Sequence, residues 1–64
     1  MKLYNLRKTW VRSLEPDCQN LIFYLDHIDG MYSYCTDTEG NVCHFQAWME
    51  VEPLTQDEIS QLGL

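Results

Sequence analysis

The sequence predicts a mainly β protein, a small five-stranded antiparallel barrel with a short C-terminal helix. Two glycine-bearing reversals, Asp29-Gly30 and Glu39-Gly40-Asn41, separate β-prone segments in the middle of the chain. Glycine supplies the positive φ that tight hairpins need, so these segments are expected to form a meander. A capping-box pattern, Thr55 followed by Glu58, predicts a helix at about residues 55–62.

Five β-prone segments are expected in order. Residues 9–14 form the first, and residues 21–27, apolar on both faces, suit the centre of a curled sheet. Residues 26–30 are then expected to turn the chain. Residues 31–37 place their two tyrosines on one face, either in the core or on a binding surface, and residues 42–45 return beside them. Residues 46–48 allow at most one 3₁₀ turn, and residues 49–52 alternate apolar and acidic side chains, as an edge strand does.

Length and composition set the class of protein. With 64 residues, the chain is expected to be one domain spanning residues 1–64, which buries only about 60% of the surface of its unfolded form. Its 45% apolar content is too high for a disordered chain. No apolar run approaches the roughly 20 residues of a membrane helix, and the first residues do not resemble a secretory signal. A cytoplasmic protein without membrane contact is the expectation.

Charge is divided unevenly along the chain. All four basic residues lie within the first twelve positions, and all ten acidic residues follow from Glu15 onward, so the two parts carry +4 and −10. An acidic surface favours a basic partner over nucleic acid, because phosphate contacts supply most non-specific nucleic-acid affinity.

The first functional hypothesis is an acidic protein-binding module that docks on a basic surface of a larger protein, with inhibition of that protein as a special case. Exposed aromatic residues ringed by carboxylates would form its binding surface, since tryptophan and tyrosine dominate binding hot spots. The residues expected there are Trp10, Asp26, Asp29, Tyr32, Tyr34, Asp37, Glu39, Trp48, Glu50 and Glu52.

The alternative hypothesis is a nucleic-acid-binding barrel. Its basic N-terminal segment would contact phosphates while Trp10 stacks on bases. The residues expected there are Lys2, Arg7, Lys8 and Arg12. The acidic remainder of the chain makes this partner the less favoured one, and a homo-oligomer is left open.

Neither a catalytic site, a cofactor nor a metal site is predicted. Asp26 and His27 are expected to point to opposite faces of an extended strand, and aspartate capping of a turn explains residues 26–29. The three cysteines match no CxxC spacing and are expected to stay reduced, with Cys35 and Cys43 on neighbouring strands. A zinc site would have to combine the adjacent Cys43-His44 with distant ligands.

Residues 40–52 resemble the end of SH3-type domains, where a strand ending in an aromatic residue precedes a small residue, an aromatic residue and a last strand. Phe45, Ala47, Trp48 and the run Met49-Glu50-Val51-Glu52 occupy these places. Residues 26–34, together with the run from Gly40 to His44, also resemble small SH3-like proteins of tailed bacteriophages. The resemblance implies an SH3-like barrel and an accessory role in binding and redirecting a host or phage protein. The chain lacks the paired tryptophans of peptide-binding SH3 domains, so Pro-rich ligands are not expected.

Overall fold

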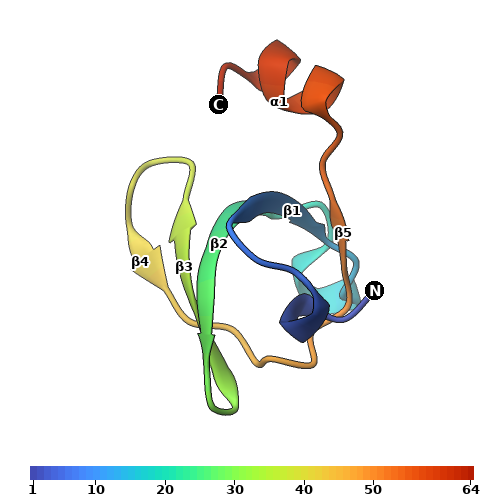
Figure 1. Ribbon diagram of the computed structural model, residues 1–64. Coiled ribbons are helices and arrows are strands. Elements are labelled where there is room, and N and C mark those ends of the chain that lie inside the picture. Colours follow the sequence, from blue (N-terminus) through green and yellow to red (C-terminus); the bar gives the residue numbers. More distant parts are fainter.

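The computed structural model describes residues 1–64 and contains one five-stranded antiparallel sheet with the strand order β4-β3-β2-β1-β5 (Figure 1). The mainly β class and the C-terminal helix are therefore confirmed. The strands are β1 (Thr9–Ser13), β2 (Ile22–Asp29), β3 (Tyr32–Asp37), β4 (Val42–Cys43) and β5 (Val51–Pro53). The helical segments are the 3₁₀ turns η1 (Leu3–Asn5) and η2 (Pro16–Cys18) and the α-helix α1 (Gln56–Leu62).

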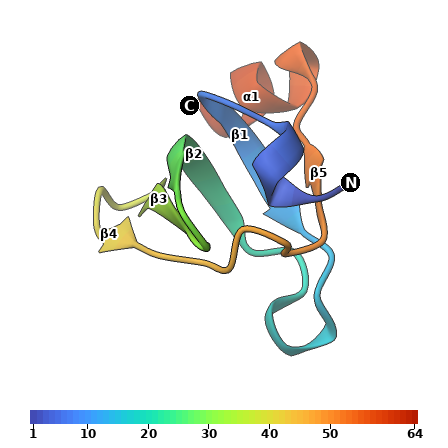
Figure 2. The same cartoon turned by 60° about the horizontal axis from the view of Figure 1, so that its bottom comes forward.

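The sheet is curled but open. Its two edges are β4 and β5, which do not pair with each other (Figures 1 and 2). Both edge strands are very short, with two and three residues, so they offer few backbone groups for a closing ladder. The five antiparallel strands are thus as predicted, but the sheet does not close into a barrel.

The first hairpin differs from the prediction that residues 26–30 turn the chain. Strand β2 continues to Asp29, which pairs with Tyr32, and the reversal is made by Gly30 and Met31 alone. Gly30 has a φ of 63°, and a positive φ at the first central position is typical of a II′ hairpin. Within β2 the register shifts between Leu25 and His27, which is a β-bulge.

The second hairpin places Cys35 and Cys43 on neighbouring strands, as predicted, and its register sets Cys35 opposite Cys43 and Thr36 opposite Val42. The carboxylate of Asp37 accepts hydrogen bonds from the backbone N–H groups of Glu39 and Asn41, both at 2.9 Å, and so stabilises the turn. The expected strand 42–45 ends early, at Cys43. The Phe45 N–H donates to the Ser33 hydroxyl and not to a backbone carbonyl of β3, while the Phe45 carbonyl accepts both the hydroxyl and the N–H of Ser33.

The core lies on the concave side of the sheet. Alternate residues of the central strands, Val11, Phe23 and Leu25, are fully buried there. The rings of Phe23 and Phe45 lie 4.5 Å apart and form its aromatic centre. Cys35 and Leu3 are also fully buried. The remaining buried apolar residues are Ala47, Met49, Val51 and Leu54.

The N-terminal segment packs along residues 47–50, far away in sequence. The Leu3 N–H donates to the carbonyl of Met49 and the Tyr4 N–H to that of Ala47, both at 2.9 Å. The expected last strand at 49–52 is shifted: Glu50 forms an isolated bridge with Lys2, and the strand itself begins at Val51.

Helix α1 begins as predicted. Thr55 is its N-cap, the capping box with Glu58 is complete, and Gly63 ends the helix in the left-handed conformation. No residue of α1 is buried. The guanidinium of Arg12 links the helix to the sheet by binding both Glu52 and Glu58. Neither α1 nor a 3₁₀ turn has the length and apolar character that a membrane-spanning helix requires.

Candidate binding surface

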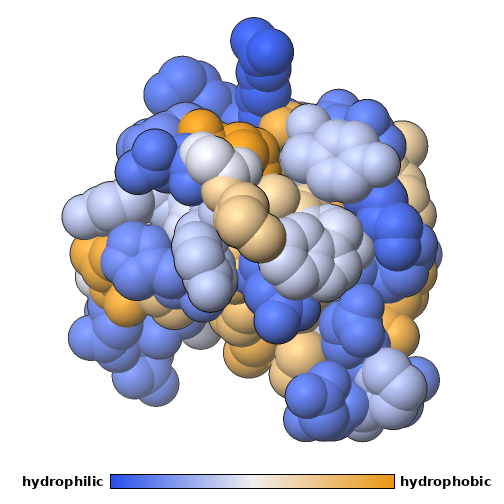
Figure 3. All heavy atoms as spheres, turned by 90° about the horizontal axis from the view of Figure 1, so that it is seen from below, coloured by the Kyte–Doolittle hydropathy of each residue, from blue (hydrophilic) through white to orange (hydrophobic).

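Four large side chains are exposed around the tip of the β2–β3 hairpin. Between 44% and 64% of the surface of Tyr4, Met31, Tyr32 and Trp48 is accessible. We call these four residues the end patch. The segments that carry them are tied together, because the Tyr4 N–H donates to Ala47 and the Ala47 N–H donates to the Met31 carbonyl, both at 2.9 Å. Figure 3 shows this end of the molecule, where pale aromatic side chains surround apolar atoms.

An acidic hollow borders the end patch at Tyr32. It has a volume of about 460 Å³. Its lining residues are Glu15, Asp17, Cys18, Tyr32, His44, Phe45, Gln46 and Met49. A carboxylate oxygen of Glu15 accepts the Glu50 N–H at 2.9 Å, which fixes that side chain, whereas Asp17 forms no ion pair. Two carboxylates beside aromatic and apolar walls suit a basic side chain.

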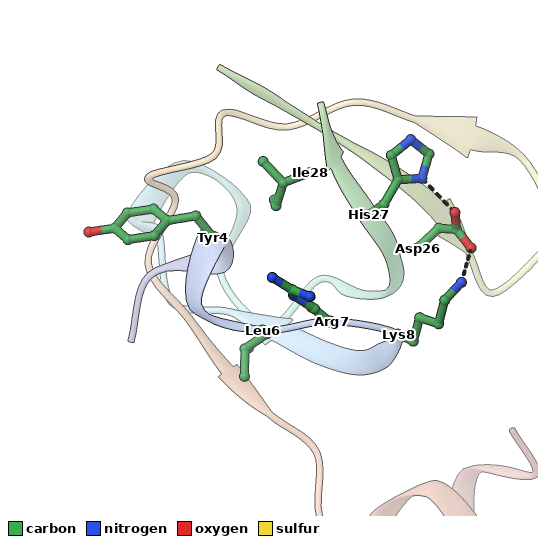
Figure 4. A pocket seen from close by; sticks show the side chains of 7 residues that line it. All are labelled: Tyr4, Leu6, Arg7, Lys8, Asp26, His27 and Ile28. Carbon is green, nitrogen blue, oxygen red and sulfur yellow. Dashed lines mark hydrogen bonds and ion pairs between the residues drawn. The ribbon is translucent and has the colours of Figure 1, made fainter. Parts of the chain in front are cut away.

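A second hollow, which we call the basic slot, lies between the N-terminal segment and β2 (Figure 4). It has a volume of about 430 Å³. Its lining residues are Tyr4, Leu6, Arg7, Lys8, Asp26, His27 and Ile28. Arg7 and Ile28 lie between the two backbone segments, and Tyr4 points away.

The bulge in β2 brings Asp26 and His27 together, which corrects the expectation that they point to opposite faces. Asp26 is the extra residue, so regular alternation is lost at this point. Nδ1 of His27 lies 2.6 Å from Oδ2 of Asp26, and the Lys8 ammonium lies 3.5 Å from Oδ1. The hydrogen bond from His27, aided by the charge of Lys8, lowers the pKa of Asp26.

Aromatic rings also line the outer face of the sheet. Trp10 and Tyr24, directly opposite each other on β1 and β2, make an edge-to-face contact at 5.4 Å. The ring of Tyr34 stacks on His27 at 5.2 Å and meets His44 edge-on at 4.7 Å. Tyr32 and Tyr34 are both exposed, so the tyrosine face of β3 is a surface and not part of the core.

The structure spreads the acidic residues of the protein-binding hypothesis over several places. Asp37 ends β3 and Glu39 lies in the turn that follows, Glu50 and Glu52 lie along the opposite edge, and Asp29 lies beside the end patch. Most of these carboxylates already form hydrogen bonds or ion pairs within the chain. Hydrogen bonds from the N-terminal ammonium and Lys2 lower the pKa of Glu50, and backbone N–H groups, that of Asn41 first, lower the pKa of Asp37. Of the aromatic residues named, Tyr32 and Trp48 share the end patch, while Trp10 and Tyr34 lie on the outer face.

The four basic residues of the alternative hypothesis do not gather on one face with Trp10. The Lys2 ammonium lies 2.9 Å from a carboxylate oxygen of Glu50. Arg12 pairs with Glu52 at 2.7 Å and with Glu58. Only Arg7 and Lys8 share a hollow, the basic slot.

No group of three or more histidine, cysteine or acidic side chains is placed to hold a metal ion. Cys35 faces the core and His27 the outer face, so the ligands considered for zinc are separated by the sheet. The three cysteines are free thiols. Burial raises the pKa of Cys35 to about 11 and also raises that of Cys43.

Sequence reasoning missed four residues of this surface: Tyr4, Met31, Glu15 and Asp17. Met31 carried a usable signal, because an apolar residue directly after the glycine of a tight hairpin lies at its tip. The place of Tyr4 depends on its pairing with Ala47, a contact across more than forty residues, which no local pattern indicates. Glu15 and Asp17 lie between β1 and β2, far in sequence from the Tyr32 side chain that they adjoin.

Comparison with known proteins gave no relative: no family model matches the chain, and neither a curated protein nor a solved structure matches it.

Proposed function

We propose that this chain is a protein-binding module that docks on a basic surface of a larger protein through its end patch. One observation carries the proposal: a tryptophan, two tyrosines and a methionine are each more than two-fifths exposed and gather at one end of the molecule. Exposed apolar groups of this kind mark interaction sites, and tryptophan and tyrosine supply most hot-spot energy.

Charge supports a basic partner. The chain carries a formal net charge of −6, and the acidic hollow with Glu15 and Asp17 opens beside Tyr32. A lysine or arginine of the partner would enter this hollow while apolar groups cover Trp48 and Met31. Rim charges of this type mainly speed association, so the association rate should fall as salt is added.

We also propose that the curled sheet is a form of the SH3-like barrel. The order β5-β1-β2-β3-β4, with the last strand beside the first, is compatible with an SH3-like barrel. We extend the proposal to a non-enzymatic accessory protein of the cytoplasm, such as a phage-type modulator or inhibitor, on the basis of the sequence resemblance.

Site-specific crosslinking in extract of the native host tests the proposal. A photoreactive methionine analogue at position 31 should capture a protein with a basic surface, and a photoreactive group at Val42, which is 57% exposed at the opposite edge, is the matched control. Trp48→Ala should weaken the captured complex by at least tenfold, as for a hot-spot tryptophan, and added salt should weaken it further.

Two results would contradict the proposal. One is equal capture from positions 31 and 42; the other is a complex whose affinity is unchanged in Trp48→Ala. Complex formation that nuclease abolishes and Lys8→Glu prevents would favour the nucleic-acid alternative instead.

A further inference from the structure

The edge of β2 that faces the basic slot carries unpaired backbone groups. Strand β1 pairs with β2 only as far as Thr9 opposite Leu25, so residues 26–29 have a neighbour on one side alone, which is β3. The residues before Thr9, from Leu6 to Lys8, diverge from β2. The basic slot lies between this N-terminal segment and β2 (Figure 4).

The direction of the Ile28 groups follows from its partner. Ile28 lies opposite Ser33, whose N–H donates to the carbonyl of Phe45 at 2.8 Å, on the side away from β2. Opposite residues of an antiparallel pair either exchange both hydrogen bonds or neither. The N–H and C=O of Ile28 therefore point away from β3 and into the basic slot, where neither has a backbone partner.

The opposite wall of the basic slot, formed by the N-terminal segment, also carries polar groups without hydrogen-bond partners. The backbone groups of Arg7 and Lys8 form no hydrogen bond, and the guanidinium of Arg7 has neither a hydrogen bond nor an ion pair. It is the one basic side chain of the protein without a carboxylate partner. Lys8 adopts a φ of 45°, which is unusual for a residue other than glycine and directs the chain away from β2.

We propose that the basic slot binds an extended peptide segment carrying a carboxylate, which adds to β2 as a short extra strand. The N–H and C=O of Ile28 would pair with the peptide backbone, as in β-strand addition. The guanidinium of Arg7 would hold the carboxylate through two parallel N–H donors. The site adjoins the end patch at Tyr4 but differs from it in charge and in partner chemistry: it is basic, in a protein of net charge −6.

The size of the hollow agrees with a short segment. Its volume of about 430 Å³ lies at the lower end of ligand sites, which span about 300–1,000 Å³. Lys8 is already engaged by Asp26 at 3.5 Å, so Arg7 is the cation available to the ligand. The carboxylate can come from a peptide C-terminus or from an acidic side chain, and the experiment separates these sources.

The test uses the full chain labelled with ¹⁵N and three acetylated peptides. The first is Thr-Val-Thr-Val with a free carboxylate, the second is the same peptide amidated, and the third is amidated Thr-Val-Asp-Val. We expect the amide resonances of Arg7, Lys8 and Ile28 to shift with the first peptide if the site takes a C-terminal carboxylate, and with the third if it takes an acidic side chain. Binding of the neutral second peptide should be at least tenfold weaker.

Arg7→Gln should weaken the carboxylate peptide about tenfold. Gln61→Glu, on exposed α1, changes the net charge by the same amount and should leave binding unchanged. Trp48→Ala should also leave it unchanged, which keeps this test independent of the proposed docking function. Three outcomes would overturn the inference. They are no shift at millimolar peptide, equal binding of the neutral peptide, or peptide shifts that acetate alone reproduces and that do not include Ile28.

Discussion

Nδ1 of His27 donates a hydrogen bond to Oδ2 of Asp26 at 2.6 Å, although the two residues are neighbours on one strand. In a regular strand their side chains would point to opposite faces. The bulge after Leu25 inserts one residue, so both side chains lie on the same side and His27 stacks on Tyr34. A bulge also bends its strand, and the basic slot lies next to this one, between β2 and the N-terminal segment.

Asp26 is one of four carboxylates whose pKa is lowered in the folded protein. The others are Asp37, Glu50 and Glu58. Unfolded aspartate and glutamate titrate near about 3.9 and 4.3, so the unfolded chain binds protons first as pH falls. Stability from these groups is fully present above about pH 5 and is lost as pH falls through the folded pKa values. Urea midpoints between pH 7 and pH 3, followed by tryptophan fluorescence, should decrease.

Asp37→Asn should reduce that pH dependence, because it removes a carboxylate that accepts two backbone hydrogen bonds. Asp29→Asn is the matched control, since Asp29 is exposed and its carboxylate forms neither a hydrogen bond nor an ion pair. A midpoint that is flat from pH 7 to pH 3 in the parent protein would contradict the assignment of these pKa shifts.

Phe23→Ala should leave the chain largely unfolded. Phe23 is fully buried and its ring contacts Phe45 at 4.5 Å. Such truncations cost about 3–5 kcal/mol, and a domain of this length has a total stability of about 3–10 kcal/mol. Circular dichroism and urea denaturation measure the loss. Tyr32→Ala, at a residue 57% exposed, should change stability by less than about 0.5 kcal/mol, and an equal loss in both variants would place Phe23 outside the core.

The features predicted correctly from the sequence are local ones. The reversal at Gly40 and the capping box at Thr55 each depend on a few adjacent residues, and the structure has both. The place of Cys35 and Cys43 on neighbouring strands followed from the same turn, because a short hairpin brings its two strands side by side.

The features missed depend on non-local pairing or on one extra residue. Strict alternation along β2 would place His27 on the same face as Leu25, but the bulge moves it to the outer face beside Tyr34. No pattern marks the bulge in advance, since Asp26 and Asp29 disfavour a strand and indicated a turn at residues 26–30, not one extra residue within β2. The end patch requires Tyr4 to meet Ala47, and Ala47 to meet Met31; only the folded sheet brings these segments together.

Thr55→Ala should fray α1 without unfolding the sheet. The Thr55 hydroxyl accepts the Glu58 N–H at 3.2 Å, and loss of such a cap costs about 0.5–2 kcal/mol. Because no residue of α1 is buried, the cost should fall on the helix alone. Amide exchange of residues 58–62 should accelerate severalfold, with that of Phe23 and Leu25 unchanged. Thr55→Ser keeps the hydroxyl and should restore protection; faster exchange throughout the sheet would show that α1 supports the core.

The Cys35 thiol should be inert in the folded protein and reactive once the chain unfolds. It is fully buried, and it donates a hydrogen bond to the Ser33 hydroxyl at 3.1 Å. Burial raises its pKa from 9.0 to about 11, which lowers the reactive thiolate fraction at neutral pH about a hundredfold, in addition to steric protection. A variant with Cys18→Ser and Cys43→Ser isolates this thiol for reaction with a disulfide reagent at pH 7.5.

In that variant, the reaction rate without denaturant should be at least a hundredfold below the rate in unfolding concentrations of urea. The rate should rise along the same urea curve as tryptophan fluorescence, because the thiol becomes accessible only when β3 leaves the core. A matched variant that retains Cys43 alone should react faster when folded, since Cys43 lies on the two-residue edge strand β4 and is only partly buried. Reaction of folded Cys35 at the rate of the urea-unfolded chain would mean that β3 does not shield the core in solution.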